Sequence, residues 1–408
     1  MIPYSFLKWT FISFLLIGCS SGSNQVPDVP DNIASLKNLV VHHDTDDSAL
    51  ITLDKEMTYA ETDKVPWGRI IKKLTVDKLG RVFIADMASN KIHVYEADGT
   101  YKVSLGSNGR GPGEFNTIWS LKTDDKYLHV FDRQHYKISF FDLESLNHLR
   151  DINLAMIQEE NRQPNWMSKK KTKGFFYRIT NFELYSEDEY LLIFSPIQPA
   201  ETNAGQTIEI SLFNWTEEEF TEHNLYSFKS DGTALYLDES DGGGVLSDVI
   251  FNPRAQIEYA SKKMLYGSGE MMLFKIYDDL GMYRAAFYYP FENARINNQA
   301  LLAQYINPDE KFKKILQKYA PETWPAYDNI VVDDQNRLWI STIINNYEIR
   351  EWWVVDLNKD GRLIGKFKIP RSKNIVLVKN GSIFTIEQDI ESGMREIAKY
   401  RFKFNISP

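Results

Sequence analysis

The sequence has little of several features on which whole classes of protein depend. It has one cysteine in 408 residues, which excludes a disulfide framework and any cysteine-rich zinc or iron–sulfur site. It has no excess of basic residues, because 47 Lys and Arg stand against 56 Asp and Glu. A nucleic-acid-binding protein shows a basic footprint, so we predict no nucleic-acid partner. The apolar fraction of 43% is that of a globular chain, and neither a disordered nor a polytopic membrane protein fits it.

Signatures of catalysis are equally scarce. The seven histidines are scattered, and no two of them have the His-x-x-x-His spacing of a helical metal pair. The glycine-rich stretch 106–113 is not a phosphate loop, because no Gly-Lys-Ser/Thr follows it. The sequence therefore assigns no cofactor, and an enzymatic activity is less expected than binding.

The first residues have the pattern of an export signal. Lys8 precedes a short apolar run at 9–17, which is too short to span a bilayer but suits a signal peptide. The run ends in Leu-Ile-Gly-Cys at 16–19, which resembles a bacterial lipobox. The resemblance implies cleavage after residue 18, lipid on Cys19, and sorting to the outer membrane, on either face, because Ser20 follows. The alternative is an ordinary free cysteine in a leader. Residues 19–45 are polar and predicted to be a flexible tether.

The remainder, 46–408, is predicted to be one domain built from a repeated unit. Residues 74–106 contain four apolar segments separated by turn signals, which is the size and pattern of one propeller blade. A leftover strand at 48–58 can complete the last blade. The prediction is an all-β, six-bladed β-propeller of four-stranded antiparallel blades. Further copies of the unit are 121–141, 182–213, 257–289, 330–369 and 375–404.

Some stretches resemble a known family. Segments 82–86, 90–95 and 109–116 are similar to an NHL repeat. Together with the lipobox and 333–340, they resemble the lipoprotein-type six-bladed β-propeller family of Bacteroidota and relatives. The resemblance implies the fold more than a function, because members of that family mostly lack an assigned activity.

The glycine-rich link predicts a crossing between blades. Gly106, Gly109, Gly111 and Gly113 permit positive φ, and Phe115 can wedge between the blades. The alternative is that the backbone amides of this link form an anion-binding nest.

A helical insertion at 293–322 interrupts the β pattern between blades four and five. Asn307 is predicted to cap a helix, with Pro308 at its first position and Glu310 as capping-box partner. An upstream helical stretch at 299–306 is expected to pair with it. The insertion is either a lid on one propeller face or a cap that shapes a ligand pocket.

Propeller ligands usually bind at the mouth of the central channel, where the innermost strands begin. Arginine there could clamp a carboxylate or phosphate, and Trp or Tyr could stack on a flat ligand such as a sugar. The alternative is that each Arg pairs within the fold and each aromatic residue fills the core. The candidate ligand-binding residues are Trp67, Arg69, Arg110, Trp119, Arg133, His135, Arg178, Arg254 and Tyr327.

Metal binding has weaker candidates, and the metal is unassigned. The run 42–47 (His-His-Asp-Thr-Asp-Asp) contains metal-ligating residue types, but it lies between the tether and the first strand. Calcium or zinc in the channel would need ligands from several blades, and the candidates are Glu114, Asn116, Asp328 and His135.

The basic run 169–173 is the only one in an acidic chain. It is predicted to be a solvated loop, or else a contact with phosphate headgroups or an acidic glycan.

These observations favour a lipid-anchored cell-envelope β-propeller that acts as a non-catalytic module binding a small molecule, a glycan or a protein. The alternative is a metal-dependent (calcium or zinc) hydrolase or lyase with its site in the propeller channel. A purely structural spacer in an envelope complex is a third hypothesis.

Overall fold

The computed structural model describes most of the chain after residue 28. Arg69, Cys19, the predicted leader 1–18 and residues 19–28 and 44–45 of the predicted tether lie outside the described residues, whereas 29–43 of that tether are described and include a short helix and a strand. Within the described part, no helix has the length and apolar character needed to cross a membrane. The described residues are 29–43, 48–60, 65, 67, 70–159, 161–171, 176–197, 206–230, 234–237, 240, 244–247, 249–305, 307–344, 348–388 and 395–405.

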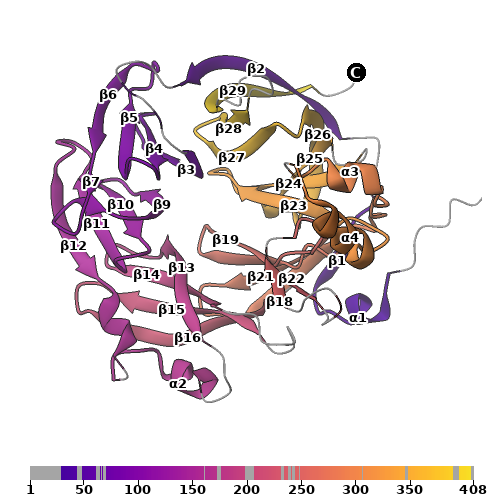
Figure 1. Cartoon of the computed structure of the whole chain (residues 1–408), viewed down its shortest axis with the longest axis horizontal. Coiled ribbons are helices and arrows are strands. Elements are labelled where there is room, and N and C mark those ends of the chain that lie inside the picture. Colours follow the sequence, from indigo (N-terminus) through magenta and orange to yellow (C-terminus); the bar gives the residue numbers. More distant parts are fainter. Residues whose placement is uncertain are drawn as a thin grey trace, which may run out of the picture.

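Six blades are arranged in a ring (Figure 1), which confirms the predicted all-β propeller. Each blade is an antiparallel sheet whose first strand in the chain lies innermost. Blade one is β3 (Ile70–Val76), β4 (Val82–Asp86), β5 (Lys91–Tyr95) and β6 (Tyr101–Leu105). Blade two is β9 (Ile118–Thr123), β10 (Tyr127–Asp132), β11 (Lys137–Asp142) and β12 (His148–Asn153). Blade three is β13 (Tyr177–Leu184), β14 (Glu189–Pro196), β15 (Thr207–Asn214) and β16 (Glu219–Lys229).

The second half of the ring has the same design. Blade four is β19 (Gln256–Ala260), β20 (Lys263–Gly267), β21 (Leu273–Asp278) and β22 (Tyr283–Tyr288). Blade five is β23 (Tyr327–Val332), β24 (Arg337–Ile344), β25 (Ile349–Asp356) and β26 (Arg362–Pro370). Blade six takes three strands from the end of the chain, β27 (Lys373–Lys379), β28 (Ser382–Gln388) and β29 (Arg395–Asn405).

The ring is closed by an N-terminal strand, as the sequence predicts. β2 (Ala49–Tyr59) pairs antiparallel with β29, from Leu50 opposite Asn405 to Tyr59 opposite Ile397. A shorter strand, β1 (Leu39–Val41), pairs parallel with β22 and adds a fifth strand to blade four. Joining the two ends of the chain in one blade leaves no free edge at the point of closure.

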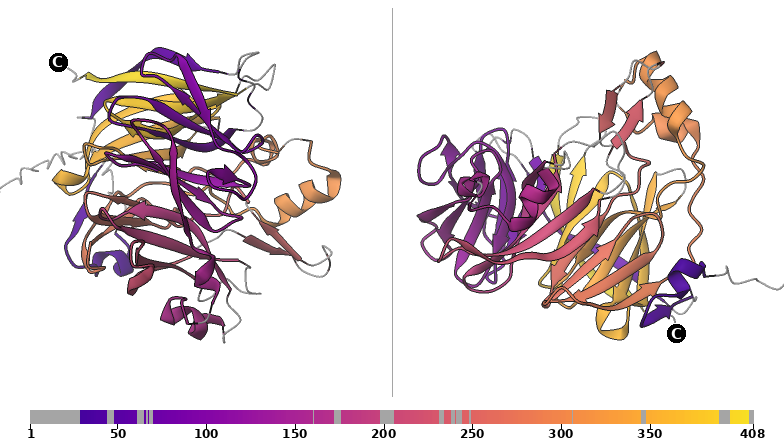
Figure 2. Two further views of the ribbon diagram at one scale, coloured as in Figure 1. Left: turned by 90° about the vertical axis from the view of Figure 1, so that its left-hand side faces the viewer. Right: turned by 90° about the horizontal axis from the view of Figure 1, so that it is seen from below.

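The antiparallel order gives the ring two distinct faces. We call the side on which the six innermost strands begin the entry face, and the opposite side the exit face. Links that cross the entry face contain β7 (Ser107–Asn108), β8 (Glu114–Phe115), η1 (Ala155–Gln158), α2 (Asn165–Lys171), β17 (Ala234–Leu237), β18 (Gly244–Ser247), α3 (Asn298–Leu302) and α4 (Glu310–Tyr319). The short η4 (Leu357–Lys359) lies in an exit-face turn of blade five. Figure 2 shows the helical insertion on one side of the ring and α1 (Asp31–Ala34) on the other.

Apolar strands build the core between neighbouring blades. All of β4 is buried, as expected for a strand covered on both faces. Phe115 is 0% exposed and packs in one cluster with residues of blades one and two, which confirms its predicted wedge position. Gly106 has a φ of +79°, and a Cβ there would lie 2.5 Å from the Phe115 ring. Gly111 does not adopt positive φ, so that part of the glycine prediction was wrong.

The same buried turn occurs in blades one and five. In blade one, the Asp77 carboxylate accepts hydrogen bonds from the backbone N–H and the Nε of Arg81, at 2.9 and 2.7 Å. Asp333 and Arg337 repeat this geometry at 2.9 and 2.6 Å. Each pair therefore locks the exit-face turn that joins the first two strands of its blade.

The helix α4 of the insertion has a different N-cap residue from the one predicted. The N-cap of α4 is Asp309, whose side chain accepts from the Phe312 N–H at 2.7 Å, and Asn307 lies two residues before it. Because Asp309 directly precedes the first turn, its carboxylate reaches an unpaired amide that Asn307 does not. α3 is shorter than predicted and ends at Leu302. Leu301, Leu316 and Trp324 form a small separate core for the insertion.

Candidate ligand-binding site at the channel mouth

β-Bulges near the entry face displace the innermost strands. In blade two, Ile118 and Ser120 oppose consecutive residues of β10, which leaves Trp119 as the extra residue. Thr180 is the extra residue in blade three, and Asp328 in blade five. Bulges change the direction of neighbouring side chains and are common at rims and functional sites.

The blade-three bulge places two polar side chains on the same side of β13. Ile179 and Phe182 are buried in the core, whereas Arg178 and Asn181 face the other side because Thr180 shifts the alternation. The Arg178 Nε and the Asn181 Oδ1 are both buried without a hydrogen-bond partner among the described residues. One unused donor and one unused acceptor therefore lie on one strand at the mouth.

A second arginine comes from blade two. The Arg133 guanidinium stacks over the Trp119 ring, 3.6 Å from its centroid. Partial burial and then the positive charge of Arg178 lower the pKa of Arg133, so the two guanidinium groups are close enough to repel each other. Neither arginine forms an ion pair with a carboxylate in the part of the chain that the structure describes. Two uncompensated cations are the chemistry of an anion-binding site.

Asp132 holds the backbone on which this site is built. Its buried carboxylate accepts from the backbone N–H groups of Asn116 (2.7 Å), Thr117 (3.3 Å), Gln134 (2.9 Å) and His135 (3.1 Å). These amides belong to the segment before Trp119 and to the turn that carries Arg133. One carboxylate thus positions both sides of the cation–π stack.

His135 lies in the same turn, but its ring has fewer contacts that fix its orientation. Its Nδ1 is 3.0 Å from the Asp132 Oδ2, and neither ring nitrogen makes a hydrogen bond of good geometry in the described structure. His135 is 14% exposed and remains a candidate contact.

Other predicted site residues have structural positions. Trp67 is 8% exposed and its Nε1 donates to the Tyr95 hydroxyl at 3.1 Å. Tyr327 is 1% exposed and its hydroxyl accepts from the Gly269 N–H at 3.0 Å, so it offers no surface to a ligand. Arg110 is exposed on the glycine-rich link. Arg254 is also exposed; burial raises the pKa of Tyr305 in the insertion, and the positive charge of Arg254 partly opposes that rise.

The four candidate metal ligands are not brought together. Among the described residues, no group of three or more His, Cys, Asp or Glu could hold a metal ion. Glu114 accepts from the Gly111 N–H at 2.8 Å, which also fills the proposed anion nest of the link. Asp328 forms an ion pair with Arg350 at 3.0 Å, and Asn116 contributes its backbone N–H to Asp132. His42 stacks on Tyr289 and its Nε2 lies 2.7 Å from the Asp360 carbonyl oxygen, while 44–47 of the predicted metal-ligating run lie outside the described residues.

The basic run is helical where it is described, so the predicted loop was wrong over 169–171. These three lysines form the last turn of α2, a position that the helix dipole favours for cations. Lys170 pairs with the buried Glu209 at 3.0 Å. The two final residues of the run, 172–173, lie outside the described residues.

A second group of charges lies on the innermost strands near the exit face. Lys122 from β9 binds both carboxylate oxygens of Glu183 from β13, at 2.8 and 2.6 Å. Burial and then repulsion from Glu183 raise the pKa of Glu258 on β19 to about 7, against the opposing effect of Lys122 and Lys73. Glu258 is therefore a carboxyl group that titrates near neutral pH.

Glu258→Gln is expected to stabilise the protein above neutral pH. A carboxyl whose folded-state pKa is raised favours folding below its unfolded pKa and loses that contribution as pH rises through about 7. Because solvent in the channel screens the group, the expected gain is about 1–2 kcal/mol at pH 8, with no gain near pH 4. Urea unfolding at both pH values measures it, and an equal gain at both would contradict it.

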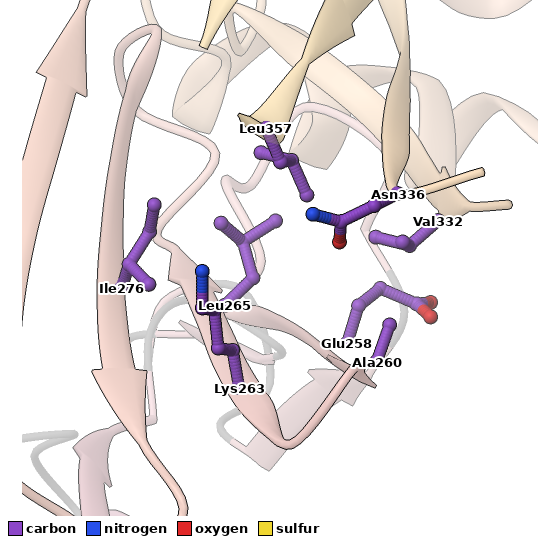
Figure 3. Close-up of a pocket in the computed structure, with 8 residues that line it drawn as sticks. All are labelled: Glu258, Ala260, Lys263, Leu265, Ile276, Val332, Asn336 and Leu357. Atoms are coloured by element: carbon purple, nitrogen blue, oxygen red, sulfur yellow. The ribbon is translucent and has the colours of Figure 1, made fainter. Parts of the chain in front are cut away.

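Glu258 also lines a cleft between blades four and five on the exit face (Figure 3). The cleft has a volume of about 20 Å³, which is room for about one water molecule, and it opens to solvent. Its walls are mostly apolar, with Asn336 and Lys263 at the rim. Its volume is below the range usual for small-molecule sites, and the mouth of the entry face is the stronger candidate.

Known proteins with similar sequences or structures have the same propeller fold. The model of the domain family DUF5128, described as a 6-bladed beta-propeller, matches residues 60–236. A DUF4221 family member from Bacteroides vulgatus has a similar structure, with a TM-score of 0.53 and 11% identity over 88% of this chain and 99% of that one. No curated protein matches the chain.

A protein from Bacteroides fragilis that is described as exported also resembles this chain. It has a TM-score of 0.49 and 11% identity, and the match covers 90% of this chain and 99% of that one. At such identities, the likeness concerns the propeller fold alone. The predicted NHL character and lipoprotein type stay predictions.

Asn181 is the site residue that sequence reasoning missed. One signal was present, because asparagine is depleted inside strands and here it interrupts an otherwise β-forming segment, 177–184. The direction of its side chain depends on the bulge at Thr180, which no spacing in the sequence announces.

Proposed function

We propose that this chain is a cell-envelope binding module, anchored by lipid on Cys19, that holds a small anionic ligand at its entry-face mouth. The observation that carries the proposal is the buried Arg178 Nε without a hydrogen-bond partner among the described residues, with the Arg133 guanidinium held nearby over Trp119. The Arg178 Nε is buried without a hydrogen-bond partner among the described residues, which costs about 1–3 kcal/mol, and an anionic ligand would supply the missing acceptor. The lipobox-like residues at 16–19 support the location.

The ligand also carries a hydrogen-bond donor. Asn181 presents an unused oxygen on the same side of β13 as the unused Arg178 Nε. They lie two pairing positions apart, a separation of roughly 7 Å along the strand. A carboxylate against the arginines and a hydroxyl against Asn181 would satisfy both atoms. A hydroxylated acid of monosaccharide size, such as a uronic acid, has groups at that separation.

Binding of D-galacturonate and inorganic sulfate to the purified protein tests the proposal by titration calorimetry. We expect Arg133→Gln and Arg178→Gln each to weaken binding of either anion by about tenfold or more, because each removes a charge-assisted hydrogen bond. Asn181→Ala should weaken galacturonate and leave sulfate unchanged, because sulfate has no hydroxyl to donate.

Arg150→Gln is the matched control. Arg150 also stacks on a tryptophan, Trp215, at 4.1 Å, but it lies on the outer strand of blade two. Equal losses in Arg150→Gln and Arg178→Gln, or no uptake of either anion by the unchanged protein, would contradict an anion site at the mouth.

A further inference from the structure

The described chain starts on the exit face of blade four. α1 precedes β1, and β1 runs parallel to β22, which begins at the exit face. Figure 2 accordingly shows α1 on the side of the ring opposite the helical insertion of the entry face. The segment that leads back toward Cys19 therefore leaves the propeller on the side away from Arg133 and Arg178.

The same part of blade four exposes apolar side chains. The turn between β21 and β22 contains Leu280, which is 70% exposed, and Met282, which is 60% exposed. Two hydrogen bonds fasten the N-terminal segment next to this turn. The Tyr283 hydroxyl donates to the Lys37 carbonyl at 2.7 Å, and the Asn38 amide donates to the Arg284 carbonyl at 2.8 Å. We call Lys37, Leu280, Met282 and Arg284 the blade-four exit surface.

Exposed apolar residues are unevenly divided between the two faces. The four most exposed large apolar side chains of the described residues all lie at exit-face ends of strands or in exit-face turns. Besides Leu280 and Met282 they are Leu79, 65% exposed, and Leu50, 61% exposed. Single exposed apolar residues are common on protein surfaces. Two in one turn, next to the first described residues of the chain, indicate a contact surface.

We propose that the blade-four exit surface docks on the membrane that holds the Cys19 lipid, so that the channel mouth faces away from the bilayer. This inference rests on the lipid anchor of the proposed function. Residues 20–30 could extend to at most ~40 Å, so the tether alone would not orient the propeller. Partial insertion of Leu280 and Met282 supplies the second membrane contact that a single-point anchor lacks.

Charge favours blade four over blades two and three. Lys37, Lys262 and Lys263 are exposed beside the apolar turn and suit anionic headgroups. Arg284 pairs with Asp278, so that carboxylate is already neutralised. The turn also contains Asp279, but three lysines outweigh this one carboxylate. The exit-face turns of blades two and three contain the acidic pairs 124–125 and 187–188 without three lysines beside them, and an anionic bilayer would repel them more strongly.

Site-specific fluorescence of the lipidated full chain tests the orientation. Leu280→Cys and Ile197→Cys each add one thiol, and Cys19 is the only native cysteine, so an NBD label attaches to the added thiol alone when lipid occupies Cys19. Ile197 is the matched control, because it is an apolar residue 45% exposed at the entry-face end of β14. The protein is reconstituted in vesicles of phosphatidylethanolamine and phosphatidylglycerol with nitroxide-labelled lipid.

We expect nitroxide lipids to quench NBD at position 280 at least roughly twofold more strongly than at position 197, with a blue-shifted emission at 280. Equal quenching at both positions, or stronger quenching at 197, would overturn the docking surface. A second reactive thiol together with release of the protein from membranes by salt washing would overturn the anchor itself. If only the docking surface is wrong, one thiol per chain is still labelled and the protein still stays on the membrane after a salt wash.

Discussion

Replacing Arg81 with alanine is expected to lower the free energy of unfolding by about 3–5 kcal/mol. Arg81 is 6% exposed and Asp77 is 1% exposed, so their ion pair is buried in the exit-face turn of blade one. The Arg81 Nη2 also donates to the Leu143 carbonyl at 2.6 Å, which links blade one to blade two. The substitution leaves the Asp77 carboxylate buried with one cation fewer and breaks a contact between blades.

Chemical denaturation with urea measures this loss. The matched control is Lys102→Ala, which removes the exposed ion pair with Glu96 in the same blade. An exposed pair contributes only about 0–1 kcal/mol, so this variant should unfold almost like the unchanged protein. Losses of similar size in the two variants would show that burial of the Asp77–Arg81 pair does not determine its contribution.

The second large effect is expected for Asp132→Ala, which should reduce both stability and ligand binding. Four backbone N–H groups lose their acceptor, and an unsatisfied buried donor costs about 1–3 kcal/mol. Since water can reach some of these amides once the carboxylate is gone, we expect a loss of about 3 kcal/mol in total. The turn that carries Arg133 is then no longer fixed against Trp119, and binding of sulfate should fall by about tenfold or more.

Asp132→Asn separates the two contributions, because the amide keeps the shape and one acceptor oxygen. It should retain more stability than Asp132→Ala and bind sulfate more tightly than that variant. Both variants are compared by urea unfolding and by calorimetry under conditions in which each is folded. Sulfate affinity unchanged in folded Asp132→Ala would show that Asp132 does not position Arg133.

Local pattern was sufficient for the fold because propeller blades are local structures. Buried strands such as β4 read as continuous apolar runs, and turn residues such as Gly99 follow at the spacing of short hairpins. The closing strand β2 could be predicted as well, since a strand left over at the start of a ring has one partner available, at the end of the chain.

The cap of α4 shows where local reasoning was too coarse. Asn307, Pro308 and Asp309 all suit a helix start, and only the geometry of the first turn selects Asp309. A run of lysines predicts a solvated loop, yet residues 169–171 are helical. Packing of Trp166 against Tyr177 and Phe194 holds that segment as a helix, and this contact joins elements distant in the chain.

The sequence by itself determined the repeat and the six-bladed ring, because each blade is a pattern within a few tens of residues, and it also determined the closure, because one strand was left over at the start of the ring. Only the tertiary structure decided which candidate residues meet. Tyr327 and Trp67 entered the core, whereas Arg133 and Arg178 came together from two blades. The deciding step was a one-residue bulge at Thr180, which turned Arg178 and Asn181 to the same side. Because a bulge places two residues opposite one, the side chains beyond it change direction, and residue spacing alone does not show this.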